Sequence, residues 1–194
     1  MSYGVIVSSA INSNLQSVYT PEQRLEQTFK TIESIRKRIP GSIIVMADSG
    51  IPGVDDELKK QLTDKVDYFL DFSKDSAVLG LKQINHKDTA QNLTELVVLN
   101  KAFKIIKDNG WFDRCDRVFK MSARYWLNEK FEIKRYKQKD ALGKYVLTKR
   151  MLSQFPKDYT GQSLQHMLRI YSFDGKLLDD FIVRLKMMTE HMQE

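Results

Sequence analysis

Residues 117–131 read RVFKMSARYWLNEKF, and their side chains alternate between apolar and polar with a period of two. Because successive side chains of a strand point to opposite faces, this pattern predicts a central β-strand. Its apolar face would comprise Phe119, Met121, Ala123, Tyr125 and Leu127. Its polar face would comprise Lys120, Ser122 and Arg124. Two cations and a hydroxyl in a row suit an anionic ligand, whereas the purely structural alternative is a half-buried strand with a solvated polar face.

The residues before this stretch predict a β-α-β unit. Residues 4–10 (GVIVSSA) and 42–47 (SIIVMA) are apolar and rich in β-branched side chains, as buried strands are. Residues 20–23 (TPEQ) form a capping-box signature that starts a helix, and the Pro-Gly pair at 40–41 ends it. Two apolar strands joined through a helix indicate a parallel sheet that is covered on both faces.

Periodicity in the rest of the chain predicts further elements on either side of the central strand. Before it we expect a helix over residues 55–63, a strand over 66–72, a loop over 73–87, and a helix from a cap at Thr89 or Asn92 to Gly110. After it we expect a basic β-hairpin around 145–147, a strand over 167–173 and a closing helix over 176–191, with Leu178, Phe181, Leu185 and Met188 facing inward. The predicted fold is therefore a single α/β domain, 1–194, with a mostly parallel sheet and helices on both faces.

The net charge of +6 is concentrated in residues 132–150. This basic segment contains seven Lys and Arg residues against Glu132 and Asp140, a net charge of +5. A local excess of this kind predicts an acidic partner, although charge runs are usually solvated surface. We expect the segment to lie beside the ligand site and to attract an anionic donor or acceptor.

Several functional classes have no support in the sequence. There is no G-x-G-x-x-G and no G-x-x-x-x-G-K-[ST], which argues against dinucleotide dehydrogenases and P-loop NTPases. One cysteine and three scattered histidines exclude internal disulfides and the usual zinc spacings. No signal peptide and no apolar run of about 20 residues is visible, so we expect a cytoplasmic protein without a membrane span.

The predicted strand ends carry a set of polar residues. In an open α/β sheet, ligands bind outside the carboxyl ends of the strands. Residues at those ends are Ser8, Asn12, Asp48, Ser122 and Arg124. Hydroxyls, an amide, a carboxylate and a cation describe a pocket for a hydroxyl-rich anion, whereas for the small residues turn formation is the simpler interpretation. Asp48 stands out because a carboxylate directly follows a wholly apolar strand.

These features together resemble a known family. A strand-helix-strand start that ends in a carboxylate, a capped helix with Glu95, and residues 119–125 (FKMSARY) are similar to GT-A-type glycosyltransferases, which use nucleotide-diphosphate sugars. The similarity is greatest to small phage and bacterial members with F-K-[IL]-S-[GA]-R-Y in the central strand, and it covers residues 5–131. It implies a nucleotide-sugar-binding core over residues 1–131, with residues 132–194 supplying the basic hairpin, the final strand and the closing helix.

The resemblance also implies roles for individual residues. The nucleotide-sugar pocket would be formed by Ser8, Asn12, Asp48, Lys120, Ser122 and Arg124, with Asn92 and Glu95 near its edge. Lys120 and Arg124 would stabilise the diphosphate, and Asp48 would hold ribose or sugar hydroxyls; Asp48 and Arg124 are the catalytic candidates. Most family members hold a divalent metal with Asp-x-Asp on the central strand, where this chain has Ser122-Ala123-Arg124. No metal ligands are therefore predicted; a divalent metal stays open as a cofactor, and Lys and Arg could replace it by neutralising the diphosphate.

Two other functions stay open. The basic segment, with Tyr125, Trp126, Tyr136 and Tyr145, suits a nucleic-acid-binding module, although its charge is confined to one region. The absent metal motif also fits a transferase-like interaction protein without activity.

Overall fold

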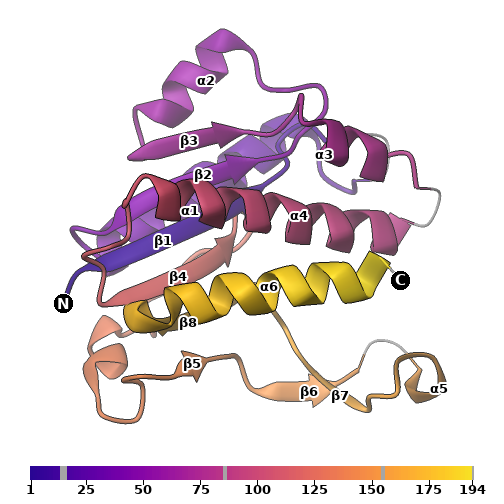
Figure 1. Cartoon of the computed structure of the whole chain (residues 1–194). Coiled ribbons are helices and arrows are strands. Elements are labelled where there is room, and N and C mark those ends of the chain that lie inside the picture. The colour runs from indigo at the N-terminus through magenta and orange to yellow at the C-terminus, as the bar shows by residue number, and fades with distance from the viewer. Residues whose placement is uncertain (14–16, 85–86, 154–155, 194) are drawn as a thin grey trace.

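The computed structural model describes residues 1–13, 17–84, 87–153 and 156–193, and six of its strands form one sheet (Figure 1). The strand order is β3-β2-β1-β4-β8-β5. The strands are β1 (Tyr3–Ser9), β2 (Ile43–Asp48), β3 (Tyr68–Asp71), β4 (Arg117–Ser122), β5 (Tyr145–Val146) and β8 (Ile170–Asp174). The first four in this order are parallel, and β8 runs antiparallel to both β4 and β5. The predicted mostly parallel α/β sheet is confirmed, and β4 is a central strand.

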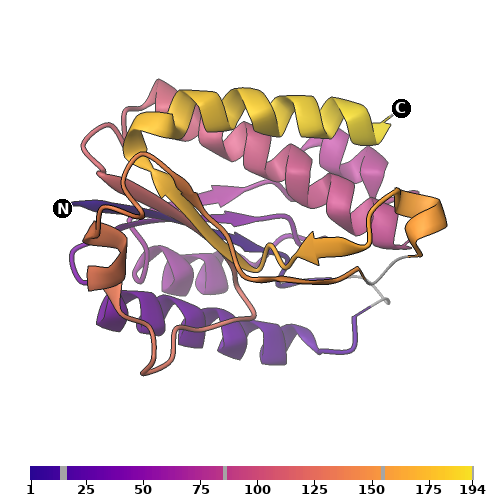
Figure 2. The same cartoon turned by 90° about the horizontal axis from the view of Figure 1, so that it is seen from below.

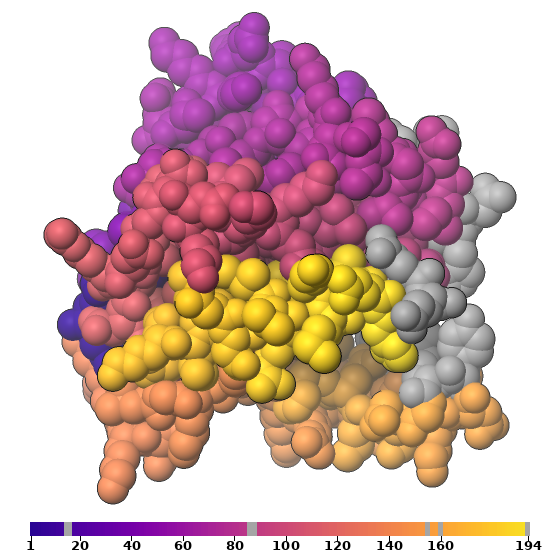
Figure 3. Space-filling view, in the orientation of Figure 1, coloured from indigo at the N-terminus to yellow at the C-terminus, as the bar shows by residue number. Residues whose placement is uncertain are grey.

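Helices cover both faces of the sheet (Figure 2). On one face lie α1 (Pro21–Arg38) and α2 (Asp56–Thr63), and on the other α3 (Ser76–Leu81), α4 (Lys87–Asp108) and α6 (Leu178–Gln193). The alternation of the strands separates two cores: Val5 and Phe119 pack against α1, whereas Ile6 and Phe173 pack against α4 and α6. In Figure 3, α4 and α6 form a continuous layer over their face.

The start of α1 matches the predicted capping box. The Thr20 hydroxyl accepts a hydrogen bond from the Gln23 amide at 3.3 Å, and the Gln23 side chain accepts one from the Thr20 amide at 3.0 Å. Pro21 is the first helical residue. The helix therefore begins directly beside the carboxyl edge of the sheet, with Arg24 in its first turn.

The central strand is shorter than the alternating pattern predicts. It ends at Ser122, whose carbonyl accepts the amide of Tyr125 in a turn, so Tyr125 and Leu127 do not belong to the strand. Its polar face is not solvated either, because the side chain of Lys120 is only 2% exposed. The period of two identified the strand but could not show that Glu95 of α4 and the Leu168 carbonyl would bind the ammonium of Lys120.

Three further local predictions are wrong. Residues 73–87 are not a loop throughout, because they contain α3, which Asp75 caps through the amides of Ala77 and Val78. Helix α4 begins at Lys87, so neither Thr89 nor Asn92 is its cap. Met188 on α6 is 47% exposed and does not pack inward.

The basic segment also differs from the prediction. It contains the short 3-10 helix η1 (Ile133–Lys137) and strand β5, and the antiparallel pair β6 (Arg150–Leu152) and β7 (Leu164–His166) begins only at its last residue. The buried Arg117 at the start of β4 donates to the Ala141 carbonyl at 2.9 Å. This bond holds Ala141 at the amino edge of the sheet, and from there β5 runs along β8 in the same direction as β4 (Figure 1).

The remaining short elements are α5 (Lys157–Thr160), which lies between β6 and β7, and the 3-10 helix η2 (Gly175–Leu177), which precedes α6. Within the described part of the chain, no helix combines the length and apolar character that crossing a membrane requires.

Candidate functional site

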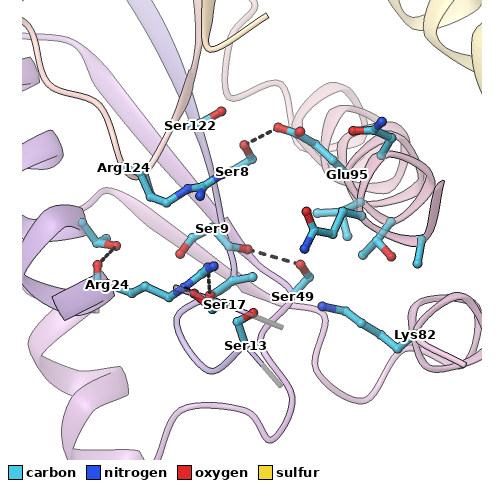
Figure 4. Close-up of a pocket in the computed structure, with 18 of the residues that line it drawn as sticks. Ser8, Ser9, Ser13, Ser17, Arg24, Ser49, Lys82, Glu95, Ser122 and Arg124 are labelled. Atoms are coloured by element: carbon cyan, nitrogen blue, oxygen red, sulfur yellow. Dashed lines mark hydrogen bonds between the residues drawn. The ribbon is translucent and has the colours of Figure 1, made fainter. Parts of the chain in front are cut away.

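A cleft of about 350 Å³ lies at the carboxyl edge of the sheet, beyond the ends of β1 and β4 (Figure 4). Its walls come from α1, the turn after α3, α4 and the turn after β4. Small hydroxyl side chains are common among its lining residues, which include Ser8, Ser9, Ser13, Ser17, Thr28, Ser49, Thr94 and Ser122. Its position agrees with the general rule for ligand sites in open α/β sheets.

Hydrogen bonds of Asp48 and Asn12 connect the loops that follow β1 and β2, below the cleft. The carboxylate of Asp48 accepts the amides of Ile11 and Gly50, each at 3.0 Å. The Asn12 side chain donates to the Gly53 carbonyl at 3.1 Å. A Cβ atom on Gly50 would lie 2.8 Å from the Asn12 nitrogen, so glycine is needed where the two loops meet. Asp48 is 1% exposed, and neither Asp48 nor Asn12 lines the cleft as the resemblance implies.

Burial determines the protonation of Asp48. It raises the pKa of the carboxyl above its usual range, although the amides of Ile11 and Gly50 oppose the shift. A buried carboxyl that already accepts two backbone hydrogen bonds has little capacity left for a ligand. The geometry therefore favours a structural role for Asp48, in place of the predicted contact to sugar hydroxyls.

Three cations line the cleft, and none of them forms an ion pair with a described residue. They are Arg124, which the sequence predicted, and Arg24 and Lys82, which it did not. Arg24 donates to the Ala10 carbonyl at 2.7 Å and to the Ser17 hydroxyl at 2.9 Å, whereas Lys82 and Arg124 make no hydrogen bond to the described residues. Figure 4 shows Arg24 and Arg124 entering from one side and Lys82 from the other.

The electrostatics of the cleft reflect this concentration of positive charge. Burial lowers the pKa of Arg24, and repulsion from Arg124 lowers it further. Burial also lowers the pKa of Lys82; attraction to Asp48 opposes this shift, and repulsion from Arg24 adds to it. Partly buried cations that repel one another are stabilised by an anion that binds between them. The cleft is therefore suited to a ligand with more than one negative charge.

A fourth cation, Lys120, lies just outside the cleft in a bonded network. Its ammonium donates to Glu95 Oε1 at 2.5 Å, to Ser122 Oγ at 3.0 Å and to the Leu168 carbonyl at 3.1 Å. Ser8 Oγ donates to the same Glu95 oxygen at 2.8 Å. Three acceptors use all three protons of the ammonium, so Lys120 does not contact a ligand in this arrangement.

Lys120 also controls the charge of Glu95. Burial by itself would raise the pKa of Glu95, but the attraction of Lys120 and the hydrogen bonds from Lys120 and Ser8 outweigh it and hold the pKa below its usual range. Glu95 is thus a carboxylate at neutral pH. It is the one acidic side chain among the described lining residues.

The donor set does not fit the divalent metal of GT-A enzymes. A hard cation requires several carboxylate or carbonyl oxygens that converge on it. Here the end of the central strand presents Ser122, Ala123 and Arg124, and one oxygen of the nearby Glu95 is already bound to Lys120. Among the described residues, no cluster of His, Cys, Asp or Glu is arranged to hold a metal ion.

The predicted site residues thus divide into two groups. Ser8, Asn92, Glu95, Ser122 and Arg124 line the cleft. Asn12, Asp48 and Lys120 support it from outside.

Sequence reasoning missed Arg24 and Lys82 for different reasons. Arg24 could have been found, because a helix that follows a parallel strand starts at the carboxyl edge and Arg24 is in the first turn of α1. Lys82 follows a helix that the sequence pattern did not reveal. Thr94, also missed, is 3% exposed and lines the cleft, and its buried hydroxyl has no hydrogen-bond partner among the described residues.

The comparisons with known proteins add no identification: no protein-family model matches the chain, and no curated protein is significantly similar to it.

Proposed function

We propose that the protein is a glycosyltransferase that binds a nucleotide-diphosphate sugar in this cleft and transfers the sugar to an acceptor. The observation that carries the proposal is the set of three cations without carboxylate partners, Arg24, Lys82 and Arg124, at the carboxyl edge of the sheet. A diphosphate supplies the missing negative charge. The surrounding serine hydroxyls and the amide of Asn92 suit the hydroxyls of ribose and sugar.

The three cations give the cleft a catalytic role as well as a binding role. When the bond between the sugar and the diphosphate breaks, negative charge develops on the departing phosphate oxygen. Cations that are already in place stabilise this charge without reorganisation, as metal ions do in other transferases. Arg124 is the strongest candidate for this role, because its guanidinium makes no hydrogen bond to the described residues and is free to form a bidentate contact.

Lys120 has a different place in this proposal from the one that the sequence suggested. Its ammonium donates all three of its hydrogen bonds to Glu95, Ser122 and the Leu168 carbonyl. Lys120 therefore supports the cleft and does not bind the ligand. The diphosphate contacts that the resemblance gives to Lys120 pass to Arg24 and Lys82. The proposal therefore keeps a metal-independent diphosphate site and replaces Lys120 in it with Arg24 and Lys82.

The nucleic-acid alternative has weaker support. Tyr136 packs edge-on against Phe119 with ring centroids 4.9 Å apart, and Tyr145 packs against Phe173 at 5.9 Å, so neither ring is free to stack on a base. Trp126 is 54% exposed, but one exposed ring does not make a stacking track. No residue of the basic segment lines the cleft: residues 141–144 are held at the amino edge of the sheet, and the segment then runs along β8 through Tyr145 and Val146.

A thermal-shift screen against nucleotide sugars tests the proposal. At a hundredfold excess over its dissociation constant, a ligand adds about 2.7 kcal/mol to the free energy of unfolding, which for a chain of this size raises Tm by about 5–10 °C. We expect at least one nucleoside-diphosphate sugar to produce such a shift in the presence of a chelator. No shift with any of them at millimolar concentration would refute the proposal. A shift without release of nucleoside diphosphate, with water or sugar acceptors, would favour the inactive interaction protein.

A further inference from the structure

The two carboxylate oxygens of Glu95 have different surroundings. Oε1 accepts hydrogen bonds from Lys120 at 2.5 Å and from Ser8 at 2.8 Å. Oε2 accepts none from the described residues. The side chain is 40% exposed and lines the cleft, and Figure 4 shows it reaching from α4 toward Ser8. One oxygen is therefore held in place, and the other is available to a ligand.

We infer that Glu95 recognises ligand hydroxyls through Oε2, that Lys120 positions it, and that the cleft consequently selects diphosphates that carry hydroxyl groups over bare diphosphates. This inference rests on the proposed function and names the feature by which the site chooses its substrate. A carboxylate can only accept hydrogen bonds, so its partner must be a donor. Sugar and ribose hydroxyls are donors, whereas phosphate oxygens at neutral pH are acceptors.

The negative charge of Glu95 affects the affinity for both classes of diphosphate. A carboxylate in a cleft built for anions repels phosphate, so Glu95 weakens the binding of any diphosphate that offers it no hydroxyl. A ligand with a hydroxyl at Oε2 regains this loss through a charge-assisted hydrogen bond. The same side chain therefore favours one class of diphosphate and disfavours the other, as in recognition that combines attraction with repulsion.

The saturation of Lys120 supports a positioning role. Its side chain is 2% exposed, and its ammonium is fixed by partners from α4, from its own strand and from the connection before β8. It also lies 5.8 Å from the centre of the Tyr171 ring. A buried ammonium that is bound on all sides cannot follow a ligand, but it can fix the direction in which Glu95 presents Oε2.

The test compares two probes on two variants by isothermal titration calorimetry. One probe is inorganic pyrophosphate, a diphosphate that carries neither sugar nor ribose. The other is the nucleotide sugar that gives the largest shift in the thermal screen. The variants are Glu95→Gln and, as a matched control, Glu57→Gln on the exposed surface of α2, outside the cleft. Both substitutions remove one carboxylate and keep its shape.

We expect the two probes to respond in opposite directions. Glu95→Gln should bind pyrophosphate about threefold or more tightly than the wild type, because the repulsion is gone. It should bind the nucleotide sugar about tenfold more weakly, because the amide cannot replace a charge-assisted acceptor. Glu57→Gln should leave both affinities unchanged. A parallel change for both probes, or no change, would overturn the inference while leaving the proposed function intact. If neither probe binds the wild type, both the proposed function and the inference are refuted.

A second variant tests the role of Lys120. In Lys120→Met, the groups that still face Glu95 are Ser8, Arg124 and the neutral phenol of Tyr171. Without the ammonium, burial dominates and Glu95 takes up a proton more easily, so nucleotide-sugar affinity should fall severalfold between pH 8 and pH 6. Wild-type affinity should stay constant over this range. A loss in Lys120→Met that is equal at both pH values would show a merely structural role, and if this variant does not fold, the opposite responses of Glu95→Gln decide the inference.

Discussion

Asp48 and Glu95 are both carboxylates near the cleft, but their surroundings give them opposite properties. Asp48 is covered by two loops, and burial raises its pKa in spite of two backbone hydrogen bonds. Glu95 is partly buried, but the ammonium of Lys120 and the hydrogen bonds to Glu95 reverse the effect of burial and hold its pKa below the usual range. The direct contact of Glu95 with the ammonium of Lys120 therefore separates the two pKa shifts in direction. This difference is the physical reason for giving Asp48 a structural role and Glu95 a role in recognition.

The raised pKa of Asp48 predicts a particular dependence of stability on pH. Because the folded chain holds this proton to a higher pH than the unfolded chain, the contribution of Asp48 to the free energy of unfolding is fully present below the unfolded-state pKa. It decreases as pH rises toward the folded-state pKa. In urea denaturation, the stability of the wild type relative to Asp48→Asn should therefore decrease from pH 4 to pH 7.

A control variant separates this effect from the loss of any surface carboxylate. Asp64→Asn removes an exposed carboxylate after α2 and should show no comparable trend relative to the wild type. If the wild type instead gains stability relative to Asp48→Asn as pH rises, the carboxylate form of Asp48 is the favoured one and the assignment is wrong.

At the level of elements, the sequence predicts those features that depend on neighbouring residues. The capping box of α1 lies within four residues, and the apolar strands of the parallel sheet are continuous runs, so both can be recognised locally. Helix α3 has only six residues, too few to show a helical period, and its capping residue Asp75 is also bound to Lys101 of α4. Such a contact across the fold leaves no local signal.

The same distinction between local and long-range features applies to the residues of the candidate site. Ser8, Ser122 and Arg124 were found because strand ends are visible in the sequence and topology places them at one edge. The burial of Lys120 depends on Glu95, 25 residues away, and on the Leu168 carbonyl, 48 residues away. The alternating pattern therefore placed Lys120 on the correct face of the strand but could not show that its charge is already satisfied.

The cap of α3 offers a prediction that connects an element to the site. Asp75 fixes the start of α3, and Lys82 follows the end of this helix. Asp75→Ala should reduce the free energy of unfolding by about 1–2 kcal/mol and weaken binding of the nucleotide sugar, because Lys82 loses its fixed position.

Asp55→Ala is the matched control, since Asp55 caps α2 through the amide of Leu58 at 2.8 Å and α2 does not line the cleft. It should cost similar stability, measured by urea denaturation, and leave the affinity unchanged in calorimetry. Equal affinities in both variants would mean that Lys82 does not contribute to the ligand site.

In the whole molecule, the cationic cleft and residues 141–144 of the basic segment lie at opposite edges of the sheet. Arg117, the first residue of β4, holds residues 141–144, whereas Ser122, the last, lines the cleft. The basic segment therefore does not extend the cleft.

This separation predicts weak binding to nucleic acids. If the basic segment followed a phosphate backbone, roughly five contacts would give a log–log slope of affinity against salt near −3.5 for single strands. We expect only weak, unsaturable binding of oligonucleotides at physiological ionic strength, because the neighbouring aromatic rings are packed into the core. The measurement is a salt titration of the wild type and of a variant with Lys134, Arg135, Lys137 and Lys139 changed to Ser. Submicromolar, steeply salt-dependent binding that this variant loses would make nucleic acid the better answer.

The central claim is that the cations of the cleft bind a diphosphate without a divalent metal. The most direct test is calorimetric titration of the best nucleotide sugar into the wild type, Arg124→Gln and the control Arg135→Gln, with and without a chelator. Arg135 is an exposed residue of the basic segment that pairs with Glu132. The account predicts that Arg124→Gln binds about tenfold or more weakly, that Arg135→Gln binds as the wild type does, and that the chelator changes nothing. Binding that the chelator abolishes and that Arg124→Gln leaves intact would contradict it.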